Sequence, residues 1–270
     1  MAEASNGGLR IHYDDEGRGT PALLIHGHTL DLRIWDDVAP LLTAAGLRVI
    51  RPDLRGHGRS DMPSKGYHWS HHAADMEAVL DDAAVERAMV VGFSLGGGVA
   101  LEMAVSHPKL VERLVLMSPV MPDRPFEPEF LDNLKQVARV ARSEGIGAAM
   151  AGPWAESPLF ARSISKPGVR ERLSTIVADF PGADYLVSER DHVDRGWTVP
   201  ERLGSVDAAT LVLVGGDEMA GFQAFAEEAA GSIPGARLEV LAGCGHLLPL
   251  EAPGEVAHRI IGHFAGSSPA

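Results

Sequence analysis

The chain has little of three things: cysteine, positive charge and long apolar runs. Its 270 residues include one cysteine, so no disulfide can form within the chain. Asp and Glu outnumber Lys and Arg by 37 to 24, and the cations are scattered, which disfavours a nucleic acid or an anionic membrane surface as a partner. No apolar run approaches the roughly 18 residues that a membrane span requires.

The start of the chain, MAEASNGG, has neither the basic segment nor the apolar segment of a secretory signal. We therefore expect a cytoplasmic protein whose partner is a small molecule, and its oligomeric state stays open. With 45% hydrophobic residues, the chain is long enough for one large α/β domain, or for a core domain that carries an insertion.

Short runs rich in leucine and β-branched residues alternate with longer stretches that have apolar residues at helical spacing. This alternation predicts βα units around a mostly parallel sheet. The predicted strands are 9–13, 22–25, 47–51, 88–91, 114–117, 211–214 and 237–241. The predicted helices between them are 35–44, 71–81, 95–106, 221–230 and 253–264.

The alternation is interrupted in the middle of the chain, where prolines separate helical patterns and no strand-like run occurs. Residues 129–141 and 169–180 each have an apolar stripe at helical spacing, which is typical of a helix packed on a neighbour. Trp154 and Phe160 are expected to pack within this segment, with substrate contact as the alternative. The predicted parts are a core, 1–118 and 209–270, and a helical cap insertion, 119–208.

One motif joins a predicted strand to a predicted helix. The stretch VVGFSLGGGVAL contains Gly92-Phe93-Ser94-Leu95-Gly96, which fits G-x-S-x-G in the strand-turn-helix context that this pattern requires. A serine on so sharp a turn has a strained backbone, and side chains two residues before and after it would crowd the turn. The turn would expose the Ser94 hydroxyl and aim the N–H of Leu95 at an oxyanion.

A serine hydroxyl is a weak nucleophile near neutral pH, so the motif requires a histidine base and a carboxylate that orients it. His246 is the best candidate for the base, because it ends the glycine-rich loop AGCGH after the last predicted strand. The acid should follow the strand LVLV, where Asp217 and Glu218 compete for one role. Asp123, after the preceding strand, is a third candidate.

A second oxyanion donor is expected from an earlier loop. The predicted strand ALLI is followed by His26-Gly27-His28, and the backbone N–H of His28 would complete the oxyanion hole with that of Leu95. For the imidazole of His28 two interpretations are open, since it either faces the pocket or packs against its neighbours.

Two other patterns are weaker indications of a functional site. His68, His71 and His72 have the i, i+3, i+4 spacing of a helical metal site, but no acidic or sulfur ligand accompanies them in a recognised pattern. Cys244 is close to His246 in the chain, yet a lone cysteine is expected to be buried and inert.

Five motifs together resemble the α/β-hydrolase superfamily: LLIHGH, RPDLRGHGRSD, GFSLGG, LVLVGGDE and GCGHLLPLEAP. They follow the family's order across nearly the whole chain, and the insertion lies where the family carries its cap. The resemblance implies the α/β-hydrolase fold, a mostly parallel twisted sheet flanked by helices, and a reaction without metal or organic cofactor. It also implies that Asp53, Arg55 and His57 brace the mouth of the active site.

The resemblance assigns the acid to Glu218, which occupies the last position of the family's G-x-x-D pattern, with Asp217 as the rival. It implies a catalytic set of Ser94, His246 and Glu218, with the N–H groups of Leu95 and His28 at the oxyanion. The serine excludes relatives that use an aspartate nucleophile. The spacing LLIHGHTLDLRIWDDVAPLL is similar to that of enol-lactonases and small-ester hydrolases, which implies a small apolar ester or lactone as substrate.

Three alternatives stay open: a perhydrolase, a carbon-carbon bond hydrolase or lyase with the same triad, and a ligand-binding protein with an idle triad. Carbon-carbon hydrolases of this superfamily usually carry Asn before the serine and Trp after the histidine, where this chain has Phe93 and Leu247. Perhydrolases often have an aromatic residue at the position of His28. The intact set of serine, acid and histidine disfavours an idle site.

Overall fold

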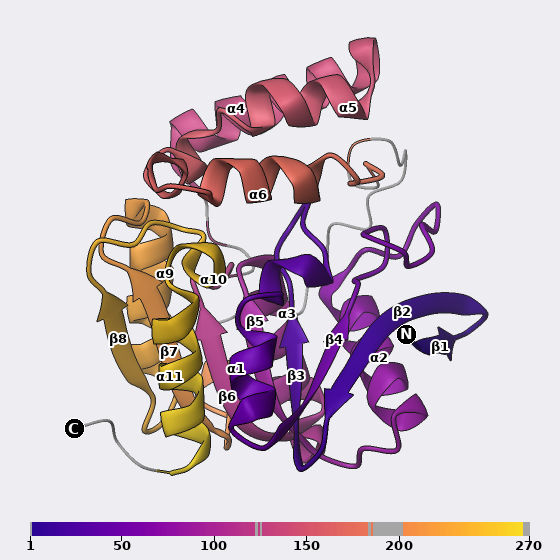
Figure 1. Cartoon of the computed structure of the whole chain (residues 1–270), viewed down its shortest axis with the longest axis vertical. Helices are drawn as coiled ribbons and strands as arrows, with labels where there is room; N and C mark the ends of the chain where they lie inside the picture. The colour runs from indigo at the N-terminus through magenta and orange to yellow at the C-terminus, as the bar shows by residue number, and fades with distance from the viewer. Residues whose placement is uncertain (1, 122–123, 125, 183–184, 186–201, 267–270) are drawn as a thin grey trace.

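A twisted eight-stranded sheet organises the molecule, seen here in a computed structural model that describes residues 2–121, 124, 126–182, 185 and 202–266 (Figure 1). The strand order is β1-β2-β4-β3-β5-β6-β7-β8. The strands are β1 Ala2–Asn6, β2 Leu9–Gly17, β3 Thr20–Ile25, β4 Leu47–Pro52, β5 Ala88–Phe93, β6 Val111–Met117, β7 Ala209–Gly215 and β8 Arg237–Leu241.

Strand direction places the loops that matter for function at one edge of the sheet. β2 is antiparallel to both of its neighbours, and all other pairings are parallel. The carboxyl ends of β3 to β8 therefore meet at the same edge. Ligands of open α/β sheets bind outside this edge.

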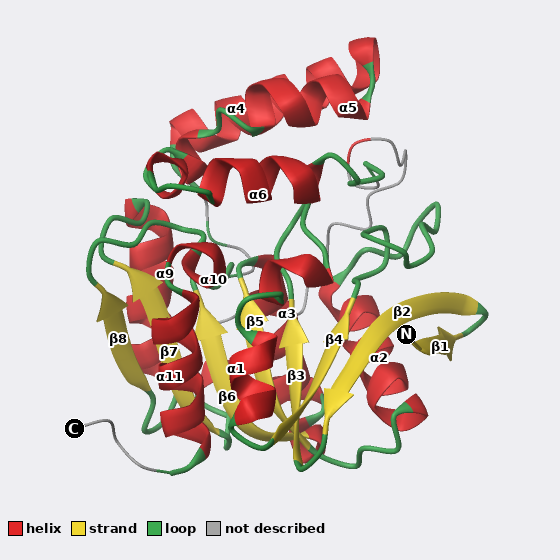
Figure 2. Ribbon diagram, viewed as in Figure 1, coloured by secondary structure: helices red, strands yellow, loops and turns green. Residues whose placement is uncertain are grey.

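Helices cover both faces of the sheet, which explains why its central strands are apolar throughout rather than alternating (Figure 2). α1 and α11 lie on the near face in Figure 1, and α2, α3 and α9 lie on the other face. Their bounds are α1 Ala39–Ala44, α2 Trp69–Asp82, α3 Leu95–Ser106, α9 Ala220–Ser232 and α11 Pro253–Phe264, with short turns at η1 Leu32–Trp35, η2 Pro108–Leu110 and α10 Leu248–Glu251. Within the described part of the chain, no helix has the length and apolar character to cross a membrane.

A group of helices between β6 and β7 lies over the carboxyl edge of the sheet (Figure 1). They are α4 Pro128–Glu144, α5 Ile146–Ala149, the turns η3 Met150–Trp154, η4 Pro158–Phe160 and η5 Ser163–Ser165, and α6 Val169–Val177. The apolar stripes expected on two of them are largely buried, since Phe130 and Val137 of α4 and Leu173 and Ile176 of α6 are at most 4% exposed. The division at 119 and 208 stays a prediction, because residues 122–123, 125, 183–184 and 186–201 lie outside the described residues.

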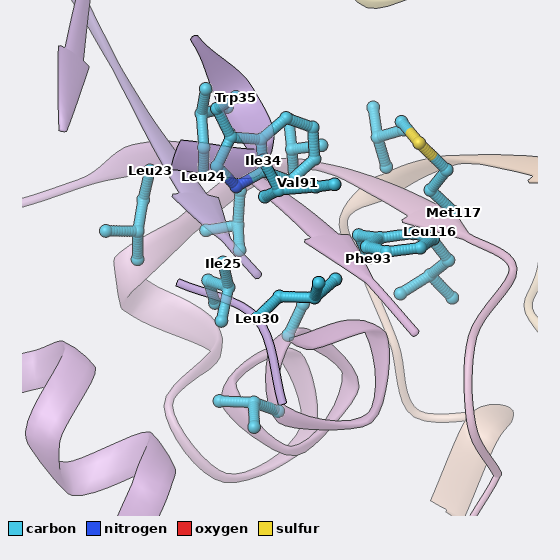
Figure 3. Packing of buried hydrophobic residues seen from close by; sticks show 14 of the residues in the cluster. Leu23, Leu24, Ile25, Leu30, Ile34, Trp35, Val91, Phe93, Leu116 and Met117 are labelled. Carbon is cyan, nitrogen blue, oxygen red and sulfur yellow. The ribbon is translucent and has the colours of Figure 1, made fainter. Parts of the chain in front are cut away.

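One part of the hydrophobic core lies where the central strands meet the loop after β3. Figure 3 shows Leu23, Leu24 and Ile25 of β3 beside Val91 and Phe93 of β5, with Trp35 packed over them. All six side chains are fully buried. The carboxyl ends of β3 and β5 are therefore rigid, and they hold the residues that follow them in fixed positions.

Every predicted strand and four of the five predicted core helices are present, which confirms the α/β-hydrolase fold, and two differences have local causes. β1 was missed because AEASN has no apolar alternation, although the following Gly7-Gly8, both at positive φ, is the signal of a tight hairpin to β2. The helix predicted at 35–44 is instead the turn η1 followed by α1. Pro40 stands in the first turn of α1, where the lack of its N–H is tolerated.

Candidate active site

Ser94 stands on a sharp turn between β5 and α3. Its backbone has φ 53° and ψ −115°, a conformation that L-residues rarely adopt. Hydrogen bonds hold it there, because the Ser94 N–H donates to Met117 O at 2.9 Å and the Ser94 carbonyl accepts from the N–H groups of Gly97 and Val120. Strain maintained by its surroundings is typical of functional residues.

The glycines around Ser94 are required by close backbone approaches. A Cβ on Gly92 would overlap the carbonyl oxygen of Gly96, and a Cβ on Gly96 would overlap the carbonyl of Ile25 at the end of β3. Gly98 faces the indole of Trp69 at the start of α2. A side chain at position 92 would thus clash within the turn itself. A side chain at position 96 would clash with the neighbouring strand β3.

The structure brings Ser94, His246 and Glu218 into one hydrogen-bonded chain. Ser94 Oγ lies 3.1 Å from His246 Nε2, and His246 Nδ1 lies 2.7 Å from Glu218 Oε2. With the proton on Nδ1, the imidazole donates to the carboxylate and accepts from the hydroxyl. All three residues are buried, with 8% exposure or less. The arrangement is that of a nucleophile, a base and an orienting acid.

Asp217, the rival of Glu218, does not take part in this chain of hydrogen bonds. Asp217 is exposed, and its backbone N–H donates to Cys244 O at 2.8 Å. Glu218 lies one residue further around the turn after β7, where its carboxylate also accepts from the Met219 N–H. Asp123, the third candidate, lies outside the described residues.

The loop after β3 lies directly against Ser94. A Cβ on Gly27 would be 3.1 Å from Ser94 Cβ, so the backbone at 27 and 28 passes close to the nucleophile. Leu95 opens α3, and the N–H groups of a first helical turn have no carbonyl in a preceding turn to bond to. His28 fits both interpretations, because it lines the cavity described below and its ring packs against the rings of Trp154 and Phe180, with Nε2 3.2 Å from Tyr185 Oη.

Trp154 steadies this loop through a relay of hydrogen bonds. Its indole N–H donates to Thr29 Oγ1 at 2.7 Å, and Thr29 Oγ1 donates to His28 O at 2.6 Å. Thr29 has φ 62°, so the loop is held in an unfavourable conformation. Trp154 was expected only to pack or to touch substrate, and no pattern in the sequence indicated this bond.

A cavity of about 530 Å³ opens above Ser94 and His246. Its walls are mainly aromatic and aliphatic side chains from the core and from the helices over the edge, including Phe93, Phe126, Phe130, Leu134, Phe160 and Phe222. The ring of Phe222 lies 4.5 Å from that of His246 and the ring of Phe93 5.1 Å from it, measured between centroids. The groups that could react thus lie in an apolar environment, where hydrogen bonds and charges act strongly.

The motif at 51–61 braces the neighbouring loops. Asp53 accepts from the backbone N–H groups of Leu32 and Arg59, each at 2.9 Å, and burial raises the pKa of its carboxyl. Arg55 forms a two-pronged ion pair with Asp75 of α2, with both N–O distances 2.6 Å. These contacts agree with the bracing role that the family resemblance implies.

His26 links this motif to the loop after β3. Its Nε2 accepts the N–H of Leu54 at 2.9 Å, and its Nδ1 lies 2.8 Å from Gly27 O, so the neutral form satisfies both contacts. Complete burial lowers the pKa of His26 to about 4. His26 is therefore a structural histidine that the sequence did not distinguish from the others.

The remaining histidine cluster and Cys244 have ordinary surroundings. Among the described residues, no group of three or more His, Cys, Asp and Glu side chains is arranged to hold a metal ion. His68 caps the start of α2 by accepting the N–H of Ser70. Cys244 is buried, and burial raises the pKa of its thiol, which disfavours the reactive thiolate.

Three residues around the His246 loop were not singled out from the sequence. Ser163, Lys166 and Glu251 contact one another and the loop. Glu251 belongs to the motif GCGHLLPLEAP, so its place after His246 was the available signal. Nothing in the local sequence of Ser163 indicated that it meets residues more than 80 positions away.

Comparison with known proteins agrees with this fold. The model of the alpha/beta hydrolase family matches residues 22–259. The chain therefore belongs to the alpha/beta hydrolase family, and the resemblance expected from its motifs is confirmed.

A solved structure, "Est816 as an N-Acyl homoserine lactone degrading enzyme", is 31% identical, has a TM-score of 0.77, and is matched over 97% of this chain and 99% of that one. The putative non-heme chloroperoxidase of Synechocystis is 36% identical over 123 residues, which are 45% of each chain. The 2-hydroxymuconate semialdehyde hydrolase of Pseudomonas sp. strain CF600 is 41% identical over 117 residues, 41% of this chain and 40% of that one. This chain thus matches less than half the length of these two curated relatives.

Proposed function

We propose that this protein is a serine hydrolase that cleaves a carboxylic ester or lactone through an acyl-enzyme formed on Ser94. The observation that carries the proposal is the unbroken hydrogen-bonded chain from Ser94 through His246 to Glu218 at the base of an apolar cavity. A strained serine with a base at 3.1 Å is the arrangement that activates a hydroxyl for attack on a carbonyl carbon.

In the first half of the reaction, Ser94 Oγ attacks the carbonyl carbon and its proton passes to His246 Nε2. Glu218 holds the Nδ1–H and stabilises the imidazolium that forms. The N–H groups of Leu95 and His28 donate to the oxyanion of the tetrahedral intermediate. The carbon-oxygen bond then breaks, and the alcohol leaves with the proton from His246.

In the second half, water attacks the acyl carbon while His246 takes up its proton. The second tetrahedral intermediate collapses, the carboxylic acid leaves, and Ser94 regains its proton from His246. A lactone follows the same path, except that its alcohol remains part of the acyl group, so deacylation releases one hydroxy acid. These steps need no group beyond the residues of the chain and water.

The cavity supports a substrate with substantial apolar surface. Its volume lies within the roughly 300–1,000 Å³ of small-molecule sites, and its aromatic walls would bury an acyl chain. The helices over the carboxyl edge, proposed here as a cap, contribute Phe130 and Phe160 to those walls. The similarity to Est816 supports including acylated lactones among the candidate substrates.

A second candidate is carbon-carbon bond hydrolysis, favoured by the similarity to the Pseudomonas hydrolase. Against it stand Phe93 and Leu247, which are completely buried at positions where such hydrolases usually carry Asn and Trp. Similarity to the Synechocystis protein keeps a perhydrolase as a further alternative. All of these reactions would use Ser94, so they differ in substrate and not in nucleophile.

A fluorophosphonate probe tests the nucleophile. We expect intact-mass analysis to show one probe on the wild-type protein and none on Ser94→Ala. Ser118→Ala, which removes another buried serine at the end of a neighbouring strand, is the matched control and should label like the wild type. Absence of labelling of the folded wild type, or equal labelling of Ser94→Ala, would contradict the proposal.

A substrate panel then separates the candidate reactions. p-Nitrophenyl esters of increasing acyl length, acylated lactones, a vinylogous diketone and a peracid assay are compared on the same preparation. We expect ester or lactone turnover that Ser94→Ala abolishes. Turnover of the diketone alone would transfer the assignment to carbon-carbon hydrolysis.

A further inference from the structure

The loop that carries His246 is held on both sides of the histidine by one pair of side chains. The N–H of Gly245 donates to Glu251 Oε2 at 2.8 Å, and the N–H of Leu247 donates to Ser163 Oγ at 3.1 Å. Ser163 Oγ itself donates to Glu251 Oε1 at 2.6 Å. The two anchor points are therefore joined to each other, and the peptide groups flanking His246 have fixed partners.

Ser163 and Glu251 are shielded from solvent, so their polar atoms depend on partners within the protein. Ser163 and the side chain of Glu251 are both 0% exposed. Lys166 Nζ lies 3.2 Å from Glu251 Oε2 and balances its charge. Burial alone would lower the pKa of the Lys166 ammonium group. Its hydrogen bond and charge attraction to Glu251 outweigh burial, so the pKa is raised overall. A paired, fully bonded buried carboxylate makes a rigid anchor.

Ser163 is contributed by the segment over the carboxyl edge, between α5 and α6. It touches the loop closely, since a Cβ on Gly245 would lie 2.8 Å from Ser163 Oγ. Gly245 is thus the residue that lets the hydroxyl reach the backbone. The segment over the cavity contacts the base-bearing loop directly, in addition to forming a wall of the cavity.

We propose that Ser163 is a positioning residue for His246, both through its own bond to the Leu247 N–H and through Glu251, which accepts the Gly245 N–H. The inference rests on the proposed function, in which His246 is the base. Without the Ser163 hydroxyl, the Leu247 N–H and one oxygen of Glu251 lose their partner, and the loop can shift. His246 must stay within hydrogen-bonding reach of Ser94 and Glu218 at once, and a displacement near 1 Å can cost about 100-fold in rate.

The test compares Ser163→Ala with Ser165→Ala. Ser165 lies in the same turn, is exposed, and donates to a near neighbour in the chain, Arg162 O, at 2.6 Å. With the best ester of the panel, we expect Ser163→Ala to lower kcat by about 10- to 100-fold while KM stays within about 3-fold. Ser165→Ala should stay within about 2-fold of the wild type in both constants.

A second measurement separates positioning from a purely structural role. We expect the proton between His246 Nδ1 and Glu218 Oε2, which are 2.7 Å apart, to give a low-field ¹H NMR resonance. We expect it to broaden or shift in Ser163→Ala, well below the melting temperature, and to be unchanged in Ser165→Ala. A purely structural role would lower the melting temperature and leave this resonance and kcat in place, which would overturn the inference.

A third variant covers the case in which Ser163→Ala does not fold. Ser163→Cys keeps a group of similar shape that is a weaker donor and acceptor. We expect its kcat to lie between those of the wild type and a fully mispositioned enzyme, with KM unchanged. Wild-type kcat in this variant would contradict the role of the hydroxyl. Failure of the proposed function would appear differently, as absence of probe labelling on Ser94 in the wild type.

Discussion

Glu218 and Asp217 are adjacent in the chain, yet one of them bonds to His246 and the other faces solvent. The reason is the close meeting of two loops. A Cβ on Gly215 would overlap the carbonyl groups of Cys244 and Gly245, so the turn after β7 lies against the His246 loop at that point. Asp217 contributes its backbone N–H to this contact, and Glu218 contributes its carboxylate.

The acid can be identified by replacing each carboxylate with its amide. We expect Glu218→Gln to lower kcat on the order of 10⁴-fold, because an amide in place of the carboxylate favours the wrong imidazole tautomer. Asp217→Asn, the matched control, should change kcat by less than about 3-fold. Steady-state kinetics on a p-nitrophenyl ester measures kcat for both variants. A large loss of kcat in Asp217→Asn alone would identify Asp217 as the acid instead.

At the scale of elements, the turn between β5 and α3 depends on how closely three pieces of backbone approach. Gly92 faces the first turn of α3, and Gly96 faces the carboxyl end of β3. Phe93 between them is fully buried under the site. The first turn of α3 contains glycines, which have poor helix propensity, because only residues without a side chain fit where this turn meets β3 and β5.

Gly92→Ala is expected to destabilise the protein and to disturb the turn. The added Cβ would meet the Gly96 carbonyl and Ala100 Cβ, and overpacking of this kind costs about 1–3 kcal/mol. Gly231→Ala, in α9 with nothing near its Cβ position, should instead raise the free energy of unfolding by about 0.5–1 kcal/mol. Urea denaturation gives both values, and equal effects of the two substitutions would refute the steric argument.

At the scale of the whole molecule, the candidate catalytic groups come from loops after β3, β5, β7 and β8, and buried contacts between loops set their relative positions (Figure 1). His26 is at the centre of one such contact, between the loop after β3 and the motif at 51–61. Its neutral form satisfies both neighbours, whereas protonation of Nε2 would remove the acceptor for the Leu54 N–H.

Acidification should therefore weaken the fold through His26. Its pKa is about 4 in the folded protein and near 6.5 when unfolded, so the unfolded chain binds the proton first and stability falls as the pH drops between these values. The contribution is roughly 3 kcal/mol between about pH 7.5 and about pH 4. His26→Gln, which cannot titrate, should be less stable at neutral pH yet lose less on acidification in urea denaturation. Parallel losses in both proteins would contradict this role.

Prediction from the sequence succeeded where the signal is local. The turn at Ser94, the His246 loop and the alternation of strands and helices each depend on residues within a short window. It was less complete where partners are distant. The Trp154 bond to Thr29 joins residues 125 positions apart, and that of Ser163 to Leu247 joins residues 84 positions apart.

The sequence by itself indicated the family fold and two candidate residues, Ser94 and His246. The reason is that strand-turn-helix and strand-loop patterns depend on consecutive residues. Only the tertiary structure showed that Glu218 bonds to His246, packed the His28 ring against the rings of Trp154 and Phe180 and placed Ser163 beside Glu251. These outcomes depend on how closely separate loops meet at the carboxyl edge of the sheet, and a linear pattern does not contain that distance.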